Sequence, residues 1–149
     1  MTDCVAMRVL IENEAGSRRK NTYDETSLLW LKAEDVSAAY PFPYGFVVGT
    51  RAGDGDAADC FVLTARNLAS GTVTECEPVG LLEQVEDGEV DHKVLAVLPG
   101  ETFELSQAEP ALRAFVGSVF AHVPGKRMTI GRLLDQQAAE AYLRSCRIA

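Results

Sequence analysis

Short apolar segments separated by turns set the strongest limit on how this chain of 149 residues can fold. Six of them are strand-like, and Gly, Pro or acidic turn residues separate most of them. They cover residues 7–13, 27–33, 44–50, 60–65, 71–85 and 93–99. Trp30 in the second segment is expected in the core, and Pro78 in the fifth indicates a bulge or a strand break. Several short strands of this kind are typical of a small β-barrel.

The last third of the chain changes to a helical pattern, which begins after Pro110 and stops at a Pro-Gly pair. Its apolar stripe consists of Leu112, Phe115, Val119 and Val123. One more strand at 127–130 and a final helix capped by Asp135 are expected to follow. The inward residues predicted for that helix region are Leu134, Ala138, Ala141 and Leu143. We therefore predict one α+β domain over residues 1–149, a small OB-like closed β-barrel of about five to six strands with two C-terminal helices packed on it.

Charge and cysteine content limit the partners and the compartment. The formal net charge is -8, from 22 acidic and 14 basic residues, which disfavours nucleic acid and anionic membranes, and hence a nucleic-acid-binding barrel. No apolar run reaches the roughly 18 residues of a membrane-spanning helix. The first ten residues lack the features of a secretory signal. Without a CxxC motif, the cysteines at positions 4, 60, 76 and 146 are expected to be reduced thiols of a cytoplasmic protein.

Three aspartates stand directly before an apolar strand, in the stretch GDGDAADCFVLT at residues 53–64. Counted from Asp54, the fifth, sixth and twelfth places lack the residues that an EF-hand calcium loop requires. Magnesium fits better, because it prefers oxygen ligands and shares substrate phosphates. A pair of divalent ions could also lower the pKa of a bound water and generate a hydroxide. The alternative is a solvated hairpin turn, for which Gly-Asp pairs are also suitable.

A second acidic group follows the next strand and could complete such a site. Asp91 and Glu86 supply carboxylates there, and Lys93 lies two residues after Asp91. In a strand that spacing puts Asp91 and Lys93 on one face. A cation would then stand beside the carboxylates, as an anionic substrate bound through metal would need.

Four segments, in this order and at these spacings, closely resemble the soluble inorganic pyrophosphatases of the single-domain, magnesium-dependent family. They read YPFPYGFVVGT, GDGDAADCFVLT, GTVTECEPVGLL and DHKVLAV, and the resemblance is strong from about Tyr40 to Pro99. It is weaker between Arg8 and Ala39, and poor after Pro99. It implies Mg²⁺-dependent hydrolysis of pyrophosphate to two phosphates by a metal-activated hydroxide. It also implies a homo-oligomer, since members of the family are often hexamers in bacteria.

The resemblance assigns a role to individual residues. Those that match the metal region are Asp54, Asp59, Asp91, Glu86 and Glu12. Asp56 matches the general base beside the attacking water, and Tyr44 matches a tyrosine that orients the nucleophile side. Those that match substrate-binding positions are Lys20, Lys32, Tyr40 and Lys93, with the register of Lys20 open by one residue.

Several positions depart from the family pattern. Glu86 replaces an aspartate, Lys32 an arginine and Thr22 a glutamate, while Val119 and Phe120 take the places of a tyrosine–lysine pair on a helix. Each charge-assisted phosphate contact contributes about 1.5–3 kcal/mol, so losing two would lower substrate binding or rate by one to several powers of ten. Two alternatives therefore remain: a protein of low activity that binds phosphate compounds, and a hydrolase for a different phosphoanhydride or a phosphate ester.

Overall fold

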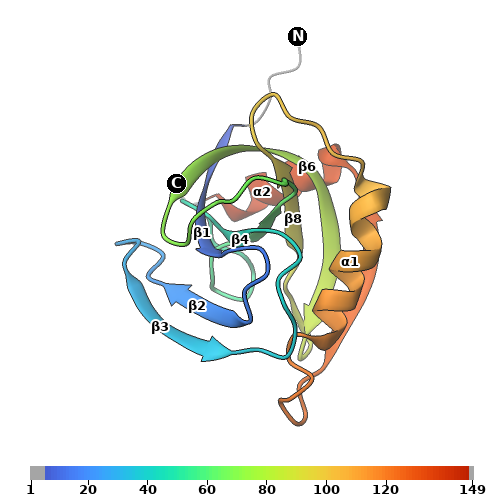
Figure 1. Ribbon diagram of the computed structural model, residues 1–149. Coiled ribbons are helices and arrows are strands. Elements are labelled where there is room, and N and C mark those ends of the chain that lie inside the picture. The colour runs from blue at the N-terminus through green and yellow to red at the C-terminus, as the bar shows by residue number, and fades with distance from the viewer. Residues whose placement is uncertain (1–5, 148–149) are drawn as a thin grey trace.

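The computed structural model describes residues 6–147, in which curved strands surround a centre with α1 on one side and α2 behind (Figure 1). The strands are β1 Met7–Asn13, β2 Arg19–Tyr23, β3 Trp30–Asp35, β4 Tyr44–Val47, β5 Asp59–Val62, β6 Val73–Glu86, β7 Glu89–Val90, β8 Lys93–Val97 and β9 Met128–Leu134. The helices are α1 Leu105–Ser118 and α2 Gln136–Cys146. Within this part of the chain, no helix is long and apolar enough to cross a membrane.

Five strands close into a ring. The pairing runs β1–β4–β5–β8–β6, and β6 pairs back with β1. All these pairs are antiparallel except β5 with β8. The short β7 and the long β9 add to β6 outside the ring, and β2 and β3 form a separate hairpin. The predicted OB-like α+β architecture is confirmed.

The long strand β6 is shared between the ring and β9, and a bulge bends it. Pro78 pairs with Ala96 and Gly80 with Leu95, so that Val79 is an extra residue on the β6 side. This confirms the irregularity that Pro78 predicted. Bulges increase local twist, which lets one strand serve two neighbours that diverge.

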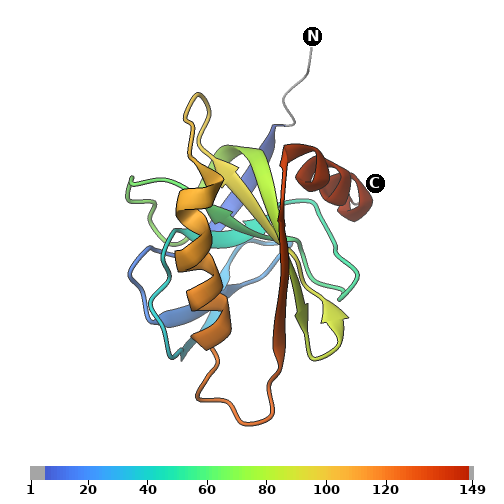
Figure 2. The same ribbon diagram turned by 90° about the vertical axis from the view of Figure 1, so that its right-hand side faces the viewer.

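Alternating side chains of the ring belong to two apolar clusters, and each helix completes one of them. One cluster includes Val9, Val62 and Val94 together with Ala139, Leu143 and Cys146 of α2. The other includes Phe61, Leu95 and Val97 together with Ala108, Leu112 and Phe115 of α1. Figure 2 shows α1 and α2 well apart, with β9 standing between them.

The helix boundaries differ from the prediction for α1 and agree for α2. Helix α1 begins at Leu105, so Pro110 lies inside it rather than at its start, and Val123 lies in the turns that follow. The helix is longer than predicted because residues before Pro110, such as Ala108, are buried in the apolar core. Helix α2 has the predicted cap, with the Ala138 amide donating to Asp135 Oδ1 at 3.1 Å. Of the predicted inward residues Leu143 is buried, Leu134 and Ala138 are half-buried, and Ala141 is exposed.

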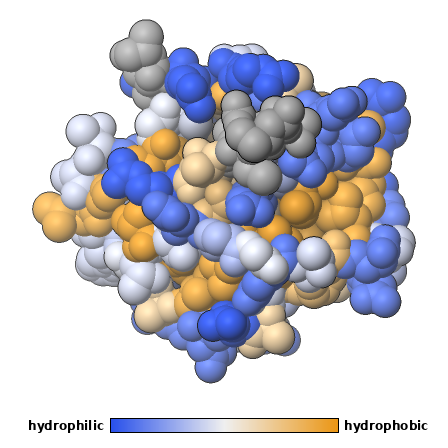
Figure 3. Space-filling view, turned by 90° about the horizontal axis from the view of Figure 1, so that it is seen from above, coloured by the Kyte–Doolittle hydropathy of each residue, from blue (hydrophilic) through white to orange (hydrophobic). Residues whose placement is uncertain are grey.

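The β2–β3 hairpin is the largest departure from the expected strand pattern. Residues 19–23 form a strand that is not among the six expected segments. Trp30 is 55% exposed rather than in the core, because β3 pairs with β2 alone. Its neighbours Leu29 and Leu31 are exposed too. Seen from above, the surface is largely hydrophilic but carries several separate hydrophobic patches (Figure 3).

Candidate active site

A cavity of about 310 Å³ lies between the barrel and α1, and we call it the central cavity. Ten of the eleven residues to which the sequence assigned a role line it: Glu12, Lys20, Tyr40, Tyr44, Asp54, Asp56, Asp59, Glu86, Asp91 and Lys93. The eleventh, Lys32, is exposed on β3 and does not line it. The fold thus gathers carboxylates and lysines from segments far apart in the sequence.

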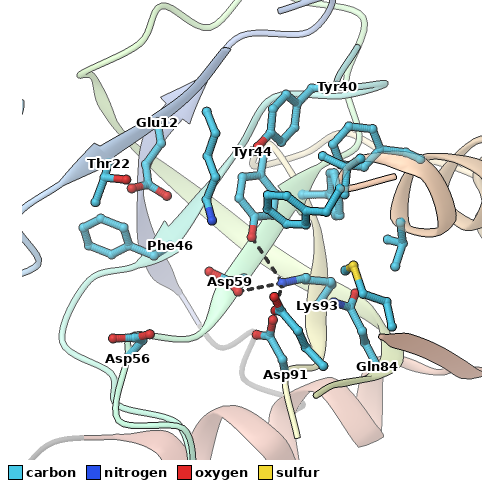
Figure 4. A pocket seen from close by; sticks show the side chains of 18 of the residues that line it. Glu12, Thr22, Tyr40, Tyr44, Phe46, Asp56, Asp59, Gln84, Asp91 and Lys93 are labelled. Carbon is cyan, nitrogen blue, oxygen red and sulfur yellow. Dashed lines mark hydrogen bonds and ion pairs between the residues drawn. The ribbon is translucent and has the colours of Figure 1, made fainter. Parts of the chain in front are cut away.

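Lys93 stands at the centre of this group (Figure 4). Its ammonium donates to Asp59 Oδ2 at 2.7 Å, to Asp91 Oδ2 at 3.0 Å and to the Tyr44 hydroxyl at 3.2 Å. Asp59 and Lys93 are register partners at the first positions of the parallel strands β5 and β8, and Asp91 comes just before β8. Strand register therefore explains why Asp59 lies beside Lys93, whereas Asp91 is close to Lys93, as predicted, from a position just outside the strand.

The side chains of this group are largely shielded from solvent and carry more negative than positive charge. The side chains of Lys93, Asp59 and Asp91 are 8%, 23% and 14% exposed. Burial raises the pKa of Asp59 above its usual range, with Lys93 opposing and Asp91 adding to the shift. Burial acts in the same sense on Asp91, but the charge of Lys93 and hydrogen bonds outweigh it, so the pKa of Asp91 is lowered. Two carboxylates thus share one ammonium.

The aspartate loop, residues 53–59, is held in a tight turn that precedes β5. The Asp56 amide donates to Asp54 Oδ1 at 3.1 Å, and Gly55 has a φ of 90°, which L side chains rarely adopt. The Ala57 amide donates to Glu25 Oε2 at 2.9 Å, so a carboxylate from the β2–β3 turn holds the loop from outside. The turn leaves Asp56 exposed where the loop borders the cavity.

Glu12, near the end of β1, adds another carboxylate to the central cavity. It accepts a hydrogen bond from the Tyr23 amide at 3.1 Å. Burial raises its pKa to about 8, and the charge of Asp59 adds to the shift while the Tyr23 hydrogen bond opposes it. The charge of Lys20 also opposes the shift, but it does not outweigh the burial.

The chemistry of these donors fits a hard divalent cation. Asp54, Asp59 and Asp91 offer carboxylate oxygens, which magnesium prefers. The raised pKa values of Glu12 and Asp59 indicate that added positive charge would be favourable there. Among residues 6–147, no three His, Cys, Asp or Glu side chains already converge as a metal-binding group. In the described structure the Lys93 ammonium lies between Asp59 and Asp91 instead.

The wall formed by α1 and its surroundings, which we call the α1 wall, has a different character. Its members are Phe115, Val116, Val119, Phe120 and Met128. Two lysines from other elements approach the Phe120 ring: Lys20 Nζ lies 4.9 Å and Lys126 Nζ 4.1 Å from its centroid. Lys126 also forms an ion pair with Glu86 at 2.6 Å. Cations therefore stand near the position of the missing helix lysine, although α1 does not carry them.

The fold and the site together define an OB-like α+β barrel with a cavity rich in carboxylates and lysines. A family model described as inorganic pyrophosphatase matches residues 9–146. The chain belongs to the inorganic pyrophosphatase family.

Individual relatives agree with this assignment. An inorganic pyrophosphatase of Synechocystis is 36% identical over 93 residues, which cover 61% of this chain and 55% of that protein. One of Nanoarchaeum equitans is 27% identical over 145 residues, 90% of this chain and 91% of that protein. The crystal structure of inorganic pyrophosphatase from Thermus thermophilus superposes with a TM-score of 0.82 at 28% identity, covering 95% of this chain and 88% of that one. The chain spans about half the length of several curated relatives that it matches, from 51% to 57%.

Three residues of this region were not predicted from the sequence or were given no definite role. Glu25 and Gln84 line the cavity, and Lys126 reaches Glu86 from the turn after α1. Glu25 follows a polar strand and Lys126 follows a Pro-Gly pair, so both look like surface residues in the sequence. The sequence signal for Gln84 is its place two residues after the apolar Leu82, where alternation along a strand predicts another inward side chain.

Proposed function

We propose that the chain acts as one pyrophosphatase-like domain, residues 1–149, that hydrolyses inorganic pyrophosphate to two phosphates with Mg²⁺. The observation that carries this proposal is the meeting of Asp54, Asp56, Asp59, Asp91 and Lys93 in one cavity. Family membership supports the same reaction.

Different residues of this chain act on the two sides of the phosphoanhydride bond that is broken. Mg²⁺ held by Asp54, Asp59 and Asp91 would supply the positive charge that lowers the pKa of a water and neutralises phosphate oxygens. Asp56, exposed at the cavity, accepts the proton of the attacking water. Tyr44 orients this side of the site, and burial raises its pKa so that its hydroxyl stays protonated.

Lys93 changes partners as the substrate binds. Its ammonium has three donors, and Asp59, Asp91 and Tyr44 take them all in this structure. If Asp59 and Asp91 held a cation, these donors would be available to a phosphate oxygen. Lys20 and Tyr40 line the same cavity. Lys20 binds phosphate there, and Tyr40 contacts the leaving phosphate. Burial also raises the pKa of Tyr40, which keeps it a hydrogen-bond donor.

The α1 wall favours a second candidate function. Apolar side chains, Val119 and Phe120 among them, stand where the resemblance expects phosphate ligands. Such a wall suits a substrate that carries an organic group on its diphosphate. The alternative is therefore a hydrolase for a larger phosphoanhydride, or a phosphate-binding protein of low activity.

Phosphate release from pyrophosphate by the purified protein, with and without Mg²⁺, tests the proposal. We expect release that depends on Mg²⁺ and falls by at least about 100-fold in Asp56→Asn, which removes the general base but keeps the side-chain shape. Nucleoside triphosphates measured in parallel separate the two candidate enzymes. A folded, Mg²⁺-binding wild type that releases no phosphate from pyrophosphate would overturn the proposal.

The exposed apolar side chains of Leu29, Trp30 and Leu31 support a homo-oligomer. A second copy that covers them would remove apolar area from water, and the family resemblance suggests a hexamer. Light scattering of the wild type and of Trp30→Ser tests this assembly: we expect several chains per particle, and fewer in the variant. A monomeric wild type would contradict it.

The cysteines support a cytoplasmic location. Cys60, Cys76 and Cys146 are free and buried, as in proteins of reducing compartments. Cys4 lies outside the described residues.

A further inference from the structure

Gln84 is buried on the wall of the central cavity, yet its amide is unpaired. The residue is 1% exposed, and neither Oε1 nor Nε2 has a hydrogen-bond partner among residues 6–147. The one other buried side-chain atom of this kind in the described chain is Asn13 Nδ2. Asn13 differs because its Oδ1 accepts hydrogen bonds from Asn21, whereas Gln84 has both ends of its amide free.

The position of Gln84 in the sheet turns this amide toward the reacting groups. The Asp91 amide donates to the Gln84 carbonyl at 2.9 Å, so the two residues face each other just beyond the last β6–β8 pair, Leu82 with Lys93. Glu86, two residues further along β6, shares the face of Gln84. Figure 4 shows the Gln84 side chain beside Lys93 and Asp91, on the side away from Asp56.

An unpaired buried amide is unfavourable, so its presence calls for a physical reason. Leaving one such donor or acceptor unsatisfied destabilises a protein by about 1–3 kcal/mol. A methionine would fill similar space without that penalty. Buried polar groups in native proteins are nearly always paired, and those that are not point to a ligand or an ordered water. Gln84 lines a cavity that can hold such a ligand.

We propose that Gln84 is a substrate-binding residue whose amide donates a hydrogen bond to a non-bridging phosphate oxygen on the α1 side of the cavity. This inference rests on the proposed function, which places a diphosphate there. It explains how a hydrogen-bonding group reaches a region where the α1 wall presents Val119 and Phe120. A neutral amide also adds no charge next to the Lys93 ion pairs.

The substitution Gln84→Met tests the proposal, with imidodiphosphate as a non-hydrolysable probe in the presence of Mg²⁺. Calorimetry should show binding weakened about 10-fold, which corresponds to roughly 1.4 kcal/mol. Steady-state kinetics on pyrophosphate should show a higher KM with little change in kcat. The midpoint of thermal unfolding without ligand should stay equal or rise, because the variant removes an unsatisfied group. Gln137→Met, on the exposed face of α2, is the matched control and should change none of these.

The results separate ligand binding from a structural role. Unchanged imidodiphosphate affinity in Gln84→Met would overturn the proposal and leave an ordered water as the partner of the amide. A large fall in unfolding temperature in both Gln84→Met and Gln84→Leu would also overturn it, because the amide would then be paired inside the folded chain. If the wild type binds imidodiphosphate through Gln84 but releases no phosphate from pyrophosphate, the proposed hydrolysis fails while the role of Gln84 stands.

Discussion

The two sides of the central cavity are built by different means. On the barrel side, Asp59 and Lys93 begin the paired strands β5 and β8, and the carboxylates of Asp59 and Asp91 lie 2.7 and 3.0 Å from the Lys93 ammonium. On the helix side, the α1 wall is apolar, and lysines reach it from β2 and from the turn after α1.

The difference shows where sequence change is tolerated. Strand register fixes Asp59 beside Lys93, so a shift of one residue in either strand would turn its side chain to the other face. A helix surface has no such partner register: α1 packs mainly through Leu112 and Phe115, whereas Phe120 follows the helix and is only partly buried against the same cluster. The barrel side of the site is therefore the less tolerant of sequence change, and the helix side is the more tolerant.

The largest expected effect comes from breaking the barrel side with Lys93→Met. Removing the ammonium leaves two mostly buried carboxylates without their shared cation, which destabilises such a site by about 3–5 kcal/mol. We expect kcat/KM to fall at least about 100-fold, because a phosphate contact is lost as well. Initial rates and chemical denaturation measure the two effects.

Two controls distinguish the loss of this buried ammonium from a general loss of positive charge. Arg144→Met removes a positive charge from the exposed face of α2 and should leave both quantities nearly unchanged. Mg²⁺ should restore part of the stability of Lys93→Met, since a divalent cation can replace the ammonium between the carboxylates. Equal losses in the two variants would mean that overall charge, not the buried group, is responsible.

Glu12 predicts a pH dependence for the metal-free protein. Its pKa is raised from the ordinary 4.5 to about 8 by burial, so the folded state holds this proton more tightly than the unfolded state does. Stability should therefore fall as the pH rises from 4.5 through 8. We expect a loss of about 2 kcal/mol from this group, less than the full shift would give because the carboxyl is partly solvated.

Denaturation of the wild type and of Glu12→Gln in the presence of a chelator, from pH 5 to pH 8, isolates this contribution. The variant cannot ionise at this position, so its stability should decline less over the same range. Parallel curves for the two proteins would show that Glu12 is ionised in the folded state without metal.

The sequence predicted the barrel side well because its rules are local. The spacing of two residues brought Asp91 and Lys93 together, although Asp91 precedes β8 and is not part of a strand, and Gly-Asp pairs marked the turn that carries Asp54 and Asp56. Pro78 marked the bulge in β6 in the same way. Each of these features depends on residues only a few positions apart.

The features that were missed depend on tertiary contacts. Trp30 is exposed because no element among residues 6–147 covers its side chain, and α1 starts before Pro110 because Ala108 is buried in the core. Lys126 pairs with Glu86, which lies 40 positions away in the sequence. Gln84 is buried by residues outside its own strand. Hydrophobic periodicity does not determine such partners.

Phe120→Lys would move the helix side toward the family pattern. The new ammonium would add a phosphate contact, and we expect imidodiphosphate with Mg²⁺ to bind about 3–10-fold more tightly. Stability without ligand should fall, because a third cation replaces a ring that now attracts Lys20 and Lys126. Calorimetry and thermal unfolding measure the two changes.

Phe120→Leu, which removes the ring without adding charge, is the control and should lose stability and gain no affinity. Equal affinities of the two variants would mean that position 120 does not face the substrate.

The smallest expected effect concerns Lys126, which shares Glu86 with whatever cation approaches the cavity. Its ammonium lies 2.6 Å from Glu86, but both side chains are 24% exposed, so the pair is partly screened by solvent. Lys126→Met frees a carboxylate and removes a like charge, and we expect Mg²⁺ to bind about 2–3-fold more tightly in a calorimetric titration at low salt. Glu86→Gln should act in the opposite direction, because it removes the carboxylate and leaves the ammonium.

If Lys126→Met leaves Mg²⁺ affinity unchanged while Glu86→Gln lowers it, the lysine does not compete for the metal and its place beside Phe120 serves the anionic substrate instead. If neither variant changes Mg²⁺ affinity, Glu86 lies outside the metal region, and the cation depends on the barrel carboxylates alone.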